Sequence, residues 1–178
     1  MSTPESKSSQ AFLSESFADV LAGNEVYAAD FEDSDLTGTA ARGLALVTCM
    51  DSRIAPLEII GMHPGDVKIL RNAGARVTED VIRTLVLATY LLGVRRVLVL
   101  PHTDCAMASR AEAELHDGIE EKYGVDTRSM EFRTVTDQRA ALATDVQRIR
   151  SHPLLPGGVV VAGAIYDVHS GRLELLDV

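Results

Sequence analysis

The sequence predicts an α/β fold with a mostly parallel central sheet flanked by helices, an antiparallel edge strand near the C-terminus and an N-terminal helical arm. Four apolar segments of strand length, residues 44–48, 67–70, 96–100 and 158–166, are separated by helical segments and short loops. This alternation is typical of strand–helix–strand units, which make parallel sheets. Residues 172–176 instead alternate between polar and apolar side chains, which suits an antiparallel edge strand.

The helices are predicted from apolar periodicity and from capping residues. Residues 11–29 carry apolar side chains at helical spacing and form the arm, which could pack on its own domain or on a neighbouring subunit. Residues 54–62 are predicted as a short helix and residues 134–150 as a longer one. Between them, Thr78 is a capping hydroxyl at the start of a helix that Gly93 can stop.

The composition is that of one globular domain. With 178 residues, 46% of them hydrophobic, the chain can bury a core, and we assign residues 11–178 to a single domain after a polar, disordered start at residues 1–10. A net charge of −9 without a long run of Lys or Arg argues against nucleic acid or an anionic membrane as partners. The start lacks the apolar core of a secretory signal, and no apolar run approaches the ~20 residues that span a bilayer, so the expected location is the cytoplasm.

Side chains that could form a site directly follow two of the predicted strands. Cys49, Asp51 and Arg53 alternate after the first strand, so an extended chain would point all three to one side. His102 and Cys105 follow the third strand. Because ligands of open α/β sheets bind outside the carboxyl ends of the strands, both groups are expected at the same rim. Two thiolates, an imidazole and a carboxylate form a tetrahedral ligand set for Zn²⁺.

Such a zinc ion would lower the pKa of a bound water, so that zinc-bound hydroxide exists near neutral pH. The Asp51 carboxylate could accept a hydrogen bond from that water and orient it, or could move onto the zinc. Arg53 would keep Asp51 ionised and oriented through a bidentate pair. Asp104, which lies between two ligands, could orient the imidazole or cap the following turn.

Plainer interpretations of the same residues stay open. Buried free cysteines are common, and Cys49 and Cys105 could form a disulfide or hold a purely structural zinc ion. Asp51 and Arg53 could be an ordinary structural ion pair.

The motif Cys49-Met-Asp51-Ser-Arg53, followed by His102-Thr-Asp-Cys105, resembles the signature of the β-class carbonic anhydrases. The resemblance extends over about residues 44–176 and includes Arg71-Asn-Ala-Gly74 in the expected place. It implies a zinc enzyme that interconverts CO₂ and water with bicarbonate and a proton, by means of zinc-bound hydroxide oriented by an Asp–Arg dyad.

By this resemblance, Cys49, His102 and Cys105 are the ligands of one zinc ion per chain. Asp51 is the fourth ligand in a closed state, or the partner of zinc-bound water in an open state, and Arg53 completes the dyad. The resemblance also implies a homodimer, often paired into a dimer of dimers, with active sites near the subunit interface.

Other positions carry weaker expectations. Asn72 and Gly74 are expected to line the substrate pocket through backbone groups. The family commonly has Gly where this chain has Ala106, and a methyl group there could tighten the pocket if the backbone needs a positive φ. The chain has no Trp, so a bicarbonate-binding site built around Trp, as in some bacterial members, cannot be present in that form.

Two further functions compete with CO₂ hydration. The same zinc site could hydrolyse CS₂ or COS, or it could belong to a zinc or redox module without catalysis. No proton-transfer residue is assigned, because His63 and His116 are expected at the surface and Tyr90 in the core.

Overall fold

The computed structural model describes residues 9–178. The chain falls into two compact units, one ending at Leu36 and the other beginning at Thr37, and each is described by itself. Most of the predicted disordered start, residues 1–10, lies outside the described residues, while positions 9 and 10 begin a helix. No helix among residues 9–178 is long and apolar enough to cross a membrane.

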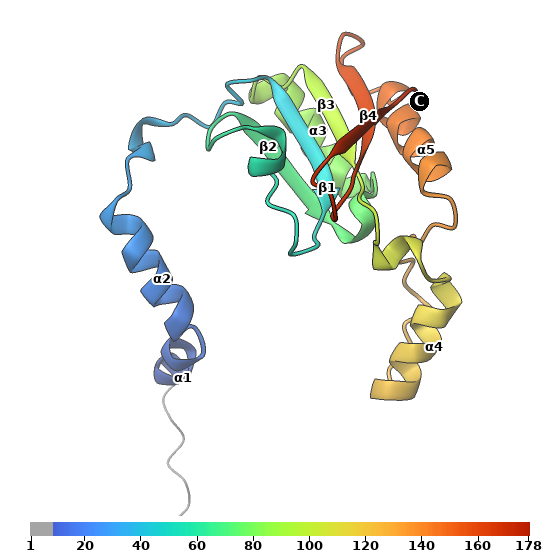
Figure 1. Cartoon of the computed structure of the whole chain (residues 1–178), viewed down its shortest axis with the longest axis horizontal. Helices are drawn as coiled ribbons and strands as arrows, with labels where there is room; N and C mark the ends of the chain where they lie inside the picture. The colour runs from blue at the N-terminus through green and yellow to red at the C-terminus, as the bar shows by residue number, and fades with distance from the viewer. Residues whose placement is uncertain (1–8) are drawn as a thin grey trace, which may run out of the picture. The chain divides into compact units, whose positions relative to one another are not determined.

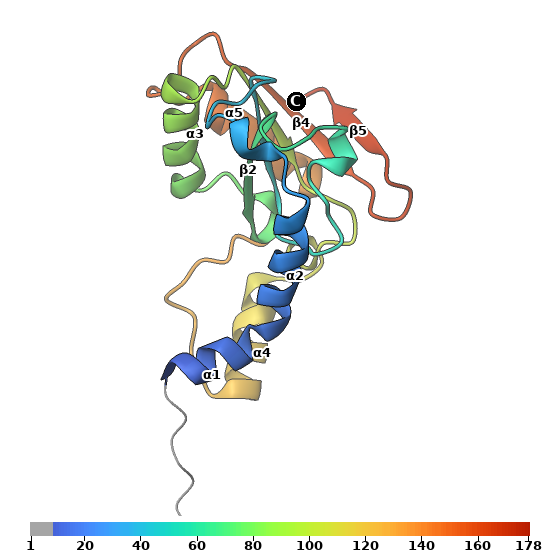
Figure 2. The same cartoon turned by 90° about the vertical axis from the view of Figure 1, so that its left-hand side faces the viewer.

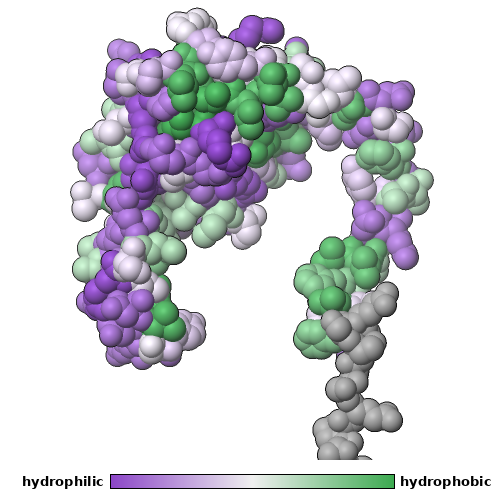
Figure 3. Space-filling view, turned by 180° about the vertical axis from the view of Figure 1, so that it is seen from behind, coloured by the Kyte–Doolittle hydropathy of each residue, from purple (hydrophilic) through white to green (hydrophobic). Residues whose placement is uncertain are grey.

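The first unit is helical. It contains α1 (Ser9–Ser16), α2 (Ala18–Ala29) and the short 3₁₀ helix η1 (Asp33–Asp35). The helix predicted for residues 11–29 is broken at Phe17, whose φ of −121° and ψ of 21° are not helical. Figure 3 shows apolar side chains of this unit as a green area beside the grey first residues. The large apolar side chains that are exposed here are Phe12, Leu13, Phe17, Val20, Leu21, Val26, Tyr27, Phe31 and Leu36.

The second unit is built on a five-stranded sheet (Figure 1). Its strands are β1 (Leu44–Cys49), β2 (Val67–Asn72), β3 (Arg96–Leu100), β4 (Val160–Tyr166) and β5 (Leu173–Leu176). They lie in the order β2-β1-β3-β4-β5, and all neighbouring pairs are parallel except β4 with β5. The predicted α/β fold with a parallel sheet and an antiparallel edge strand is confirmed.

Three helices belong to this unit: α3 (Glu79–Leu91), α4 (Glu112–Tyr123) and α5 (Gln138–Arg150). The Thr78 hydroxyl accepts a hydrogen bond from Val81 N at 3.4 Å, so the predicted cap of α3 is confirmed.

Two predicted helices are shorter than expected. Asp137 caps α5 by accepting hydrogen bonds from two backbone N–H groups, so the helix begins at Gln138 rather than at residue 134. The helix expected at residues 54–62 is only the 3₁₀ turn η2 (Glu58–Ile60), which a glycine with a φ of 62° ends.

Helices α3 and α5 pack on the same face of the sheet (Figures 1 and 2), where they share one apolar core with β1, β3 and β4. Leu85 of α3 and Val146 of α5 are fully buried in this core. A second apolar cluster lies on the opposite side of the strands, and the loop after β1 contributes Ile54 and Ile60 to it. The two clusters bury β1 completely, as the sequence of this strand predicts.

The strand order determines where a site can form. Strand β2 pairs with one edge of β1, and β3 pairs with the other edge. The connections therefore change direction between β1 and β3, and the loops at the carboxyl ends of these strands can diverge around a ligand. These two loops carry the residues that the sequence singles out.

Candidate metal centre

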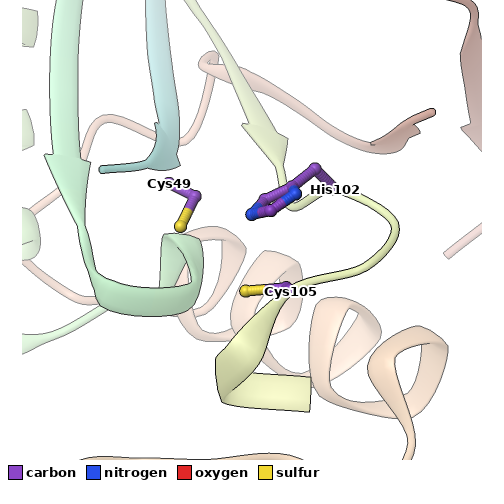
Figure 4. A group of neighbouring side chains, drawn as sticks. All are labelled: Cys49, His102 and Cys105. Atoms are coloured by element: carbon purple, nitrogen blue, oxygen red, sulfur yellow. The ribbon is translucent and has the colours of Figure 1, made fainter. Parts of the chain in front are cut away.

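Three potential metal ligands converge at the carboxyl ends of β1 and β3. Cys49 is the last residue of β1, His102 follows β3, and Cys105 precedes the 3₁₀ turn η4 (Ala106–Ala108). Their ligand atoms all lie within 4.8 Å of one another, and all three residues are buried. Figure 4 shows both sulfur atoms and the imidazole ring directed toward a shared space. Both cysteines are free, so the two thiols are not joined in a disulfide.

The imidazole of His102 is prepared to donate a lone pair. Its Nδ1 lies 2.8 Å from the carbonyl oxygen of Thr103, which can only accept, so Nδ1 carries the proton and Nε2 carries the lone pair. Nε2 is buried and has no hydrogen-bond partner. Burial of a polar atom without a partner raises the free energy of the folded state, so we expect this nitrogen to bind a ligand. A zinc ion between it and the two sulfurs would satisfy it, so the residues present fit the metal.

The two thiols differ in acidity. A hydrogen bond from the Cys105 thiol lowers the pKa of Cys49, and the Gly74 N–H adds to this effect by donating to Cys49 Sγ at 3.4 Å. The Cys49 thiolate in turn raises the pKa of Cys105. The interaction between the two sulfurs therefore favours a thiolate at Cys49, which is the form that binds a cation.

Asp51 and Arg53 form a bidentate pair beside the cluster. Arg53 Nε donates to Asp51 Oδ1 at 3.0 Å, and Arg53 Nη2 donates to Asp51 Oδ2 at 2.7 Å. These bonds hold the pKa of Asp51 well below its usual range, so the carboxylate is ionised at neutral pH. Its Oδ2 lies 3.8 Å from His102 Nε2, which is too far for a hydrogen bond but close enough for one bound atom to contact both.

Asp104 also contacts the guanidinium of Arg53. The sequence had suggested two other roles for Asp104, namely orienting the imidazole or capping the following turn. Arg53 Nη1 donates to Asp104 Oδ2 at 2.8 Å, and Arg53 Nη2 donates to the Asp104 carbonyl oxygen at 3.1 Å. Asp104 therefore neither orients the imidazole, whose Nδ1 is bonded to Thr103, nor caps η4, which has no side-chain cap. The strand pairing gives the reason, because the loops after β1 and β3 are neighbours.

Two side chains hold the backbone of the candidate site residues in place. Arg71 donates from Nε to the Cys49 carbonyl at 2.8 Å and from Nη2 to the Asp51 carbonyl at 2.6 Å. Gln138 Nε2 donates to the His102 carbonyl at 2.8 Å. Sequence reasoning missed both roles, because their partners lie far away along the chain. The only sequence signal for Arg71 was its place in the Arg71-Asn-Ala-Gly74 motif, which indicates a role near the site but not which atoms it contacts.

Of the predicted pocket residues, Asn72 is the last residue of β2, and Gly74 lies in the 3₁₀ turn η3 (Ala73–Ala75) that follows. The Asn72 side chain bonds both the N–H and the carbonyl of Arg76, at 2.8 and 2.7 Å. Gly74 has a φ of 77°, and a Cβ added there would lie 3.0 Å from Met107 Cβ, so both conformation and space favour glycine. Gly74 and Cys105 also border a narrow hollow, with the Arg76–Asp145 ion pair on its wall.

Four further expectations can be compared with the structure. Ala106 lies in η4 with an exposed side chain and is not among the described residues with positive φ, so its methyl group causes no backbone strain. His63 is exposed as expected. The expectation for His116 is wrong, because its ring is buried against Phe132. The expectation for Tyr90 is also wrong, because it lies on the solvent side of α3.

Comparison with known proteins gives an independent result. A family model described as "Carbonic anhydrase" matches residues 44–173, which include the site residues described above. Beta-carbonic anhydrase 1 of Mycobacterium tuberculosis is 34% identical over 159 residues, which cover 88% of this chain and 94% of that protein. A solved carbonic anhydrase from Streptococcus mutans is 35% identical with a TM-score of 0.86, covering 90% of this chain and 97% of that chain.

A relative with a different named activity also matches. The carbon disulfide hydrolase of Saccharolobus solfataricus is 30% identical over 157 residues, which cover 75% of this chain and 76% of that protein.

Proposed function

The chain belongs to the β-carbonic anhydrase family, a family of lyases, and we propose that it catalyses the reversible hydration of CO₂ to bicarbonate and a proton. The ligands of one zinc ion per chain would be Cys49, His102 and Cys105. The observation that carries this proposal is the buried, unpartnered lone pair of His102 Nε2, which faces two cysteine sulfurs beside an ionised carboxylate.

When bound, the zinc ion supplies Lewis-acid activation of water near neutral pH. Asp51 can accept a hydrogen bond from that water and orient its lone pair toward the substrate carbon. Arg53 keeps this carboxylate ionised and fixes the direction of both oxygens. With Oδ2 only 3.8 Å from His102 Nε2, Asp51 can alternatively approach the metal as a fourth ligand in a closed state.

Asn72 and Gly74 complete the proposed substrate-binding side. The Asn72 amide fixes the turn after β2, and the Gly74 N–H faces Cys49 Sγ. We propose that this turn lines the space for the substrate with backbone atoms.

Metal analysis and stopped-flow CO₂ hydration test the proposal. We expect about one zinc ion per chain and a rate above buffer between about pH 7 and 9, where zinc-bound water ionises. Protein stripped of metal by a chelator is the control and should give the buffer rate. Zinc-loaded protein that gives only the buffer rate would contradict the proposed activity.

Hydrolysis of CS₂ or COS is the second candidate, and the 30% identity to a carbon disulfide hydrolase favours it. Such substrates could react at the same metal position, so the ligands do not separate the two activities. Release of H₂S from CS₂ at a rate far above that of CO₂ hydration would favour this candidate.

A zinc or redox module without catalysis is a third candidate. Thiol titration distinguishes it, because ligated cysteines react only after denaturation. Loss of both thiols to a disulfide, with no bound metal, would support the redox alternative.

We further propose that the protein acts in the cytoplasm as a homodimer or a dimer of dimers, with residues 11–178 forming one functional domain. The first unit supports an assembly, because its large apolar side chains are exposed. Residues 9–36 also carry no Lys or Arg. We propose that a neighbouring subunit covers the exposed apolar side chains of this segment.

Light scattering on the full chain tests the assembly. We expect at least a dimer for the unaltered protein and a shift toward monomer for Phe17→Glu, since Phe17 is 53% exposed and apolar. Asn24→Glu is the matched control on the exposed part of α2 and should keep the original mass. A monomeric mass for the unaltered chain would contradict the assembly.

A further inference from the structure

We propose that Asp104 is a positioning residue that holds Arg53 and, through it, Asp51. It would thereby tie the loop that carries Cys49 to the loop that carries His102 and Cys105. The consequence for turnover rests on the proposed function, while the consequence for the metal environment does not.

Hydrogen bonds engage all three nitrogen atoms of the Arg53 guanidinium. Nε and Nη2 bind the two Asp51 oxygens, Nη1 binds Asp104 Oδ2, and Nη2 also binds the Asp104 carbonyl. The fixed planar fork of an arginine then relates the two carboxylates in space. Asp51 and Arg53 are two residues apart on one loop, and within residues 9–178 the hydrogen bonds that attach this pair to the second loop are those to Asp104.

The backbone of Asp104 is arranged for this contact. Its φ of 55° lies in the left-handed region. Asp tolerates this region better than most residues, but the conformation is unfavourable for any residue other than glycine. In this conformation both the carboxylate and the carbonyl of Asp104 accept from Arg53. A strained residue between two metal ligands indicates a functional constraint.

Exposure argues against a role in folding alone. The side chains of Arg53 and Asp104 are 44% and 63% exposed. Ion pairs this exposed add little to stability in general, because water screens them. The geometry of the contact therefore suggests positioning of the neighbouring carboxylate.

Loss of Asp104 should release one side of the guanidinium. Arg53 would then be held by Asp51 alone, and the two side chains could move together. Asp51 would no longer be kept beside the metal position, so it could swing onto the metal or away from it. Movement onto the metal would add a ligand, and movement away would remove the hydrogen-bond partner of a metal-bound water, so either would change the surroundings of the metal and the orientation of that water.

Two variants test this inference. Asp104→Gly relieves the left-handed strain and removes the carboxylate, while Asp104→Asn keeps a residue that tolerates this conformation and removes only the charge. We expect kcat for CO₂ hydration to fall about 10- to 100-fold in both variants, as is usual for residues that orient a metal site. KM should stay within about twofold and the zinc content should not change, because no metal ligand is altered.

A second readout does not depend on activity. Replacement of zinc by Co²⁺ gives a visible absorption spectrum that reports the number and type of ligands. We expect Asp104→Gly to change this spectrum in the otherwise unaltered protein, but to have no further effect when Arg53→Ala is already present. Asp126→Asn is the matched control, since Asp126 is 64% exposed and pairs with Arg128 at 3.1 Å. It should change neither kcat nor the spectrum.

An unchanged Co²⁺ spectrum in Asp104→Gly would overturn the inference, as would a spectral change that persists in the Arg53→Ala background. A change in melting temperature with an unaltered kcat would also overturn it, because this pattern indicates a purely structural role. If the unaltered enzyme does not hydrate CO₂, the proposed function fails, and the Co²⁺ spectra still decide whether Asp104 acts through Arg53.

Discussion

Two arginine–aspartate clusters in this protein have nearly the same chemistry and opposite surroundings. Arg53 binds Asp51, Asp104 and a backbone carbonyl at the edge of the candidate metal centre. Arg76 binds Asp145 at 2.7 Å and the Arg133 carbonyl at 3.0 Å. The side chains of the second cluster are only 18% and 6% exposed, whereas those of Arg53 and Asp51 are 44% and 21% exposed.

Burial decides what each cluster can do. The Arg76–Asp145 pair joins the turn after β2 to α5 and excludes water, so removal of one partner would leave a buried charge without compensation. The Arg53 cluster stays in contact with solvent, where ion pairs add little to folding. Its bidentate geometry instead determines the position of a carboxylate beside three potential metal ligands. The first cluster should therefore affect turnover, and the second should affect stability.

The largest expected effect is on stability, from Asp145→Ala. Removal of this carboxylate leaves the Arg76 guanidinium partly buried and unpaired, which costs about 3–5 kcal/mol of the free energy of unfolding. Urea unfolding of the zinc-loaded protein measures this quantity, and kcat per folded molecule should stay within a few-fold. The double variant Arg76→Met with Asp145→Leu is the control and should recover most of the loss, because it removes both charges. A fall in kcat with unchanged stability would reverse the assignment of the two clusters.

The opposite pattern is expected for Asp51→Ala. Loss of this carboxylate should lower kcat about 100-fold or more, as for a residue that handles a proton in the reaction. The free energy of unfolding should change little, and the zinc content should stay near one per chain because the three other ligands remain. Stopped-flow CO₂ hydration and metal analysis on the same sample measure both. Full activity in this variant would remove Asp51 from the mechanism.

Arg53→Lys refines the comparison by keeping the charge. Lysine cannot form the fork that binds both Asp51 oxygens and Asp104 together, so orientation is lost while electrostatic attraction remains. We expect kcat to fall about tenfold, which is less than for loss of the carboxylate itself. The measurement is the same stopped-flow assay, with Arg128→Lys as a control at an exposed arginine that binds three carboxylates elsewhere. Equal kcat values for Arg53→Lys and the unaltered enzyme would mean that charge alone suffices.

The sequence predicts the potential metal ligands better than the residues that hold them in place. Cys49, His102 and Cys105 follow apolar strands, and the carboxyl ends of parallel strands meet at one edge, so topology alone brings them together. The contacts of Asp104 with Arg53 and of Gln138 with His102 depend on residues 51 and 36 positions apart. Such contacts follow from loop conformation, including the left-handed φ at Asp104, which no local pattern specifies.

Errors in the fold predictions have a similar physical cause. Tyr90 was expected in the core because α3 is rich in apolar residues, but only one face of this helix meets the sheet. His116 was expected at the surface from its charged neighbours, yet its ring packs on Phe132 and its Nδ1 lies 2.8 Å from Thr127 Oγ1. In both cases the tertiary partner, and not the local composition, determines burial.

The smallest expected effect comes from Glu131→Gln, which tests whether burial is the property that separates the two clusters. Arg133 takes part in both environments, because its carbonyl accepts from the buried Arg76 while its Nε donates to Glu131 at 3.2 Å on the surface. The Glu131 side chain is 69% exposed, so water screens this pair. Loss of its charge should change the free energy of unfolding by less than about 1 kcal/mol and leave kcat unchanged. A loss comparable to that of Asp145→Ala in the same urea experiment would show that the surface pair holds the Arg133 backbone in place, and that stability in this region extends beyond the buried ion pair.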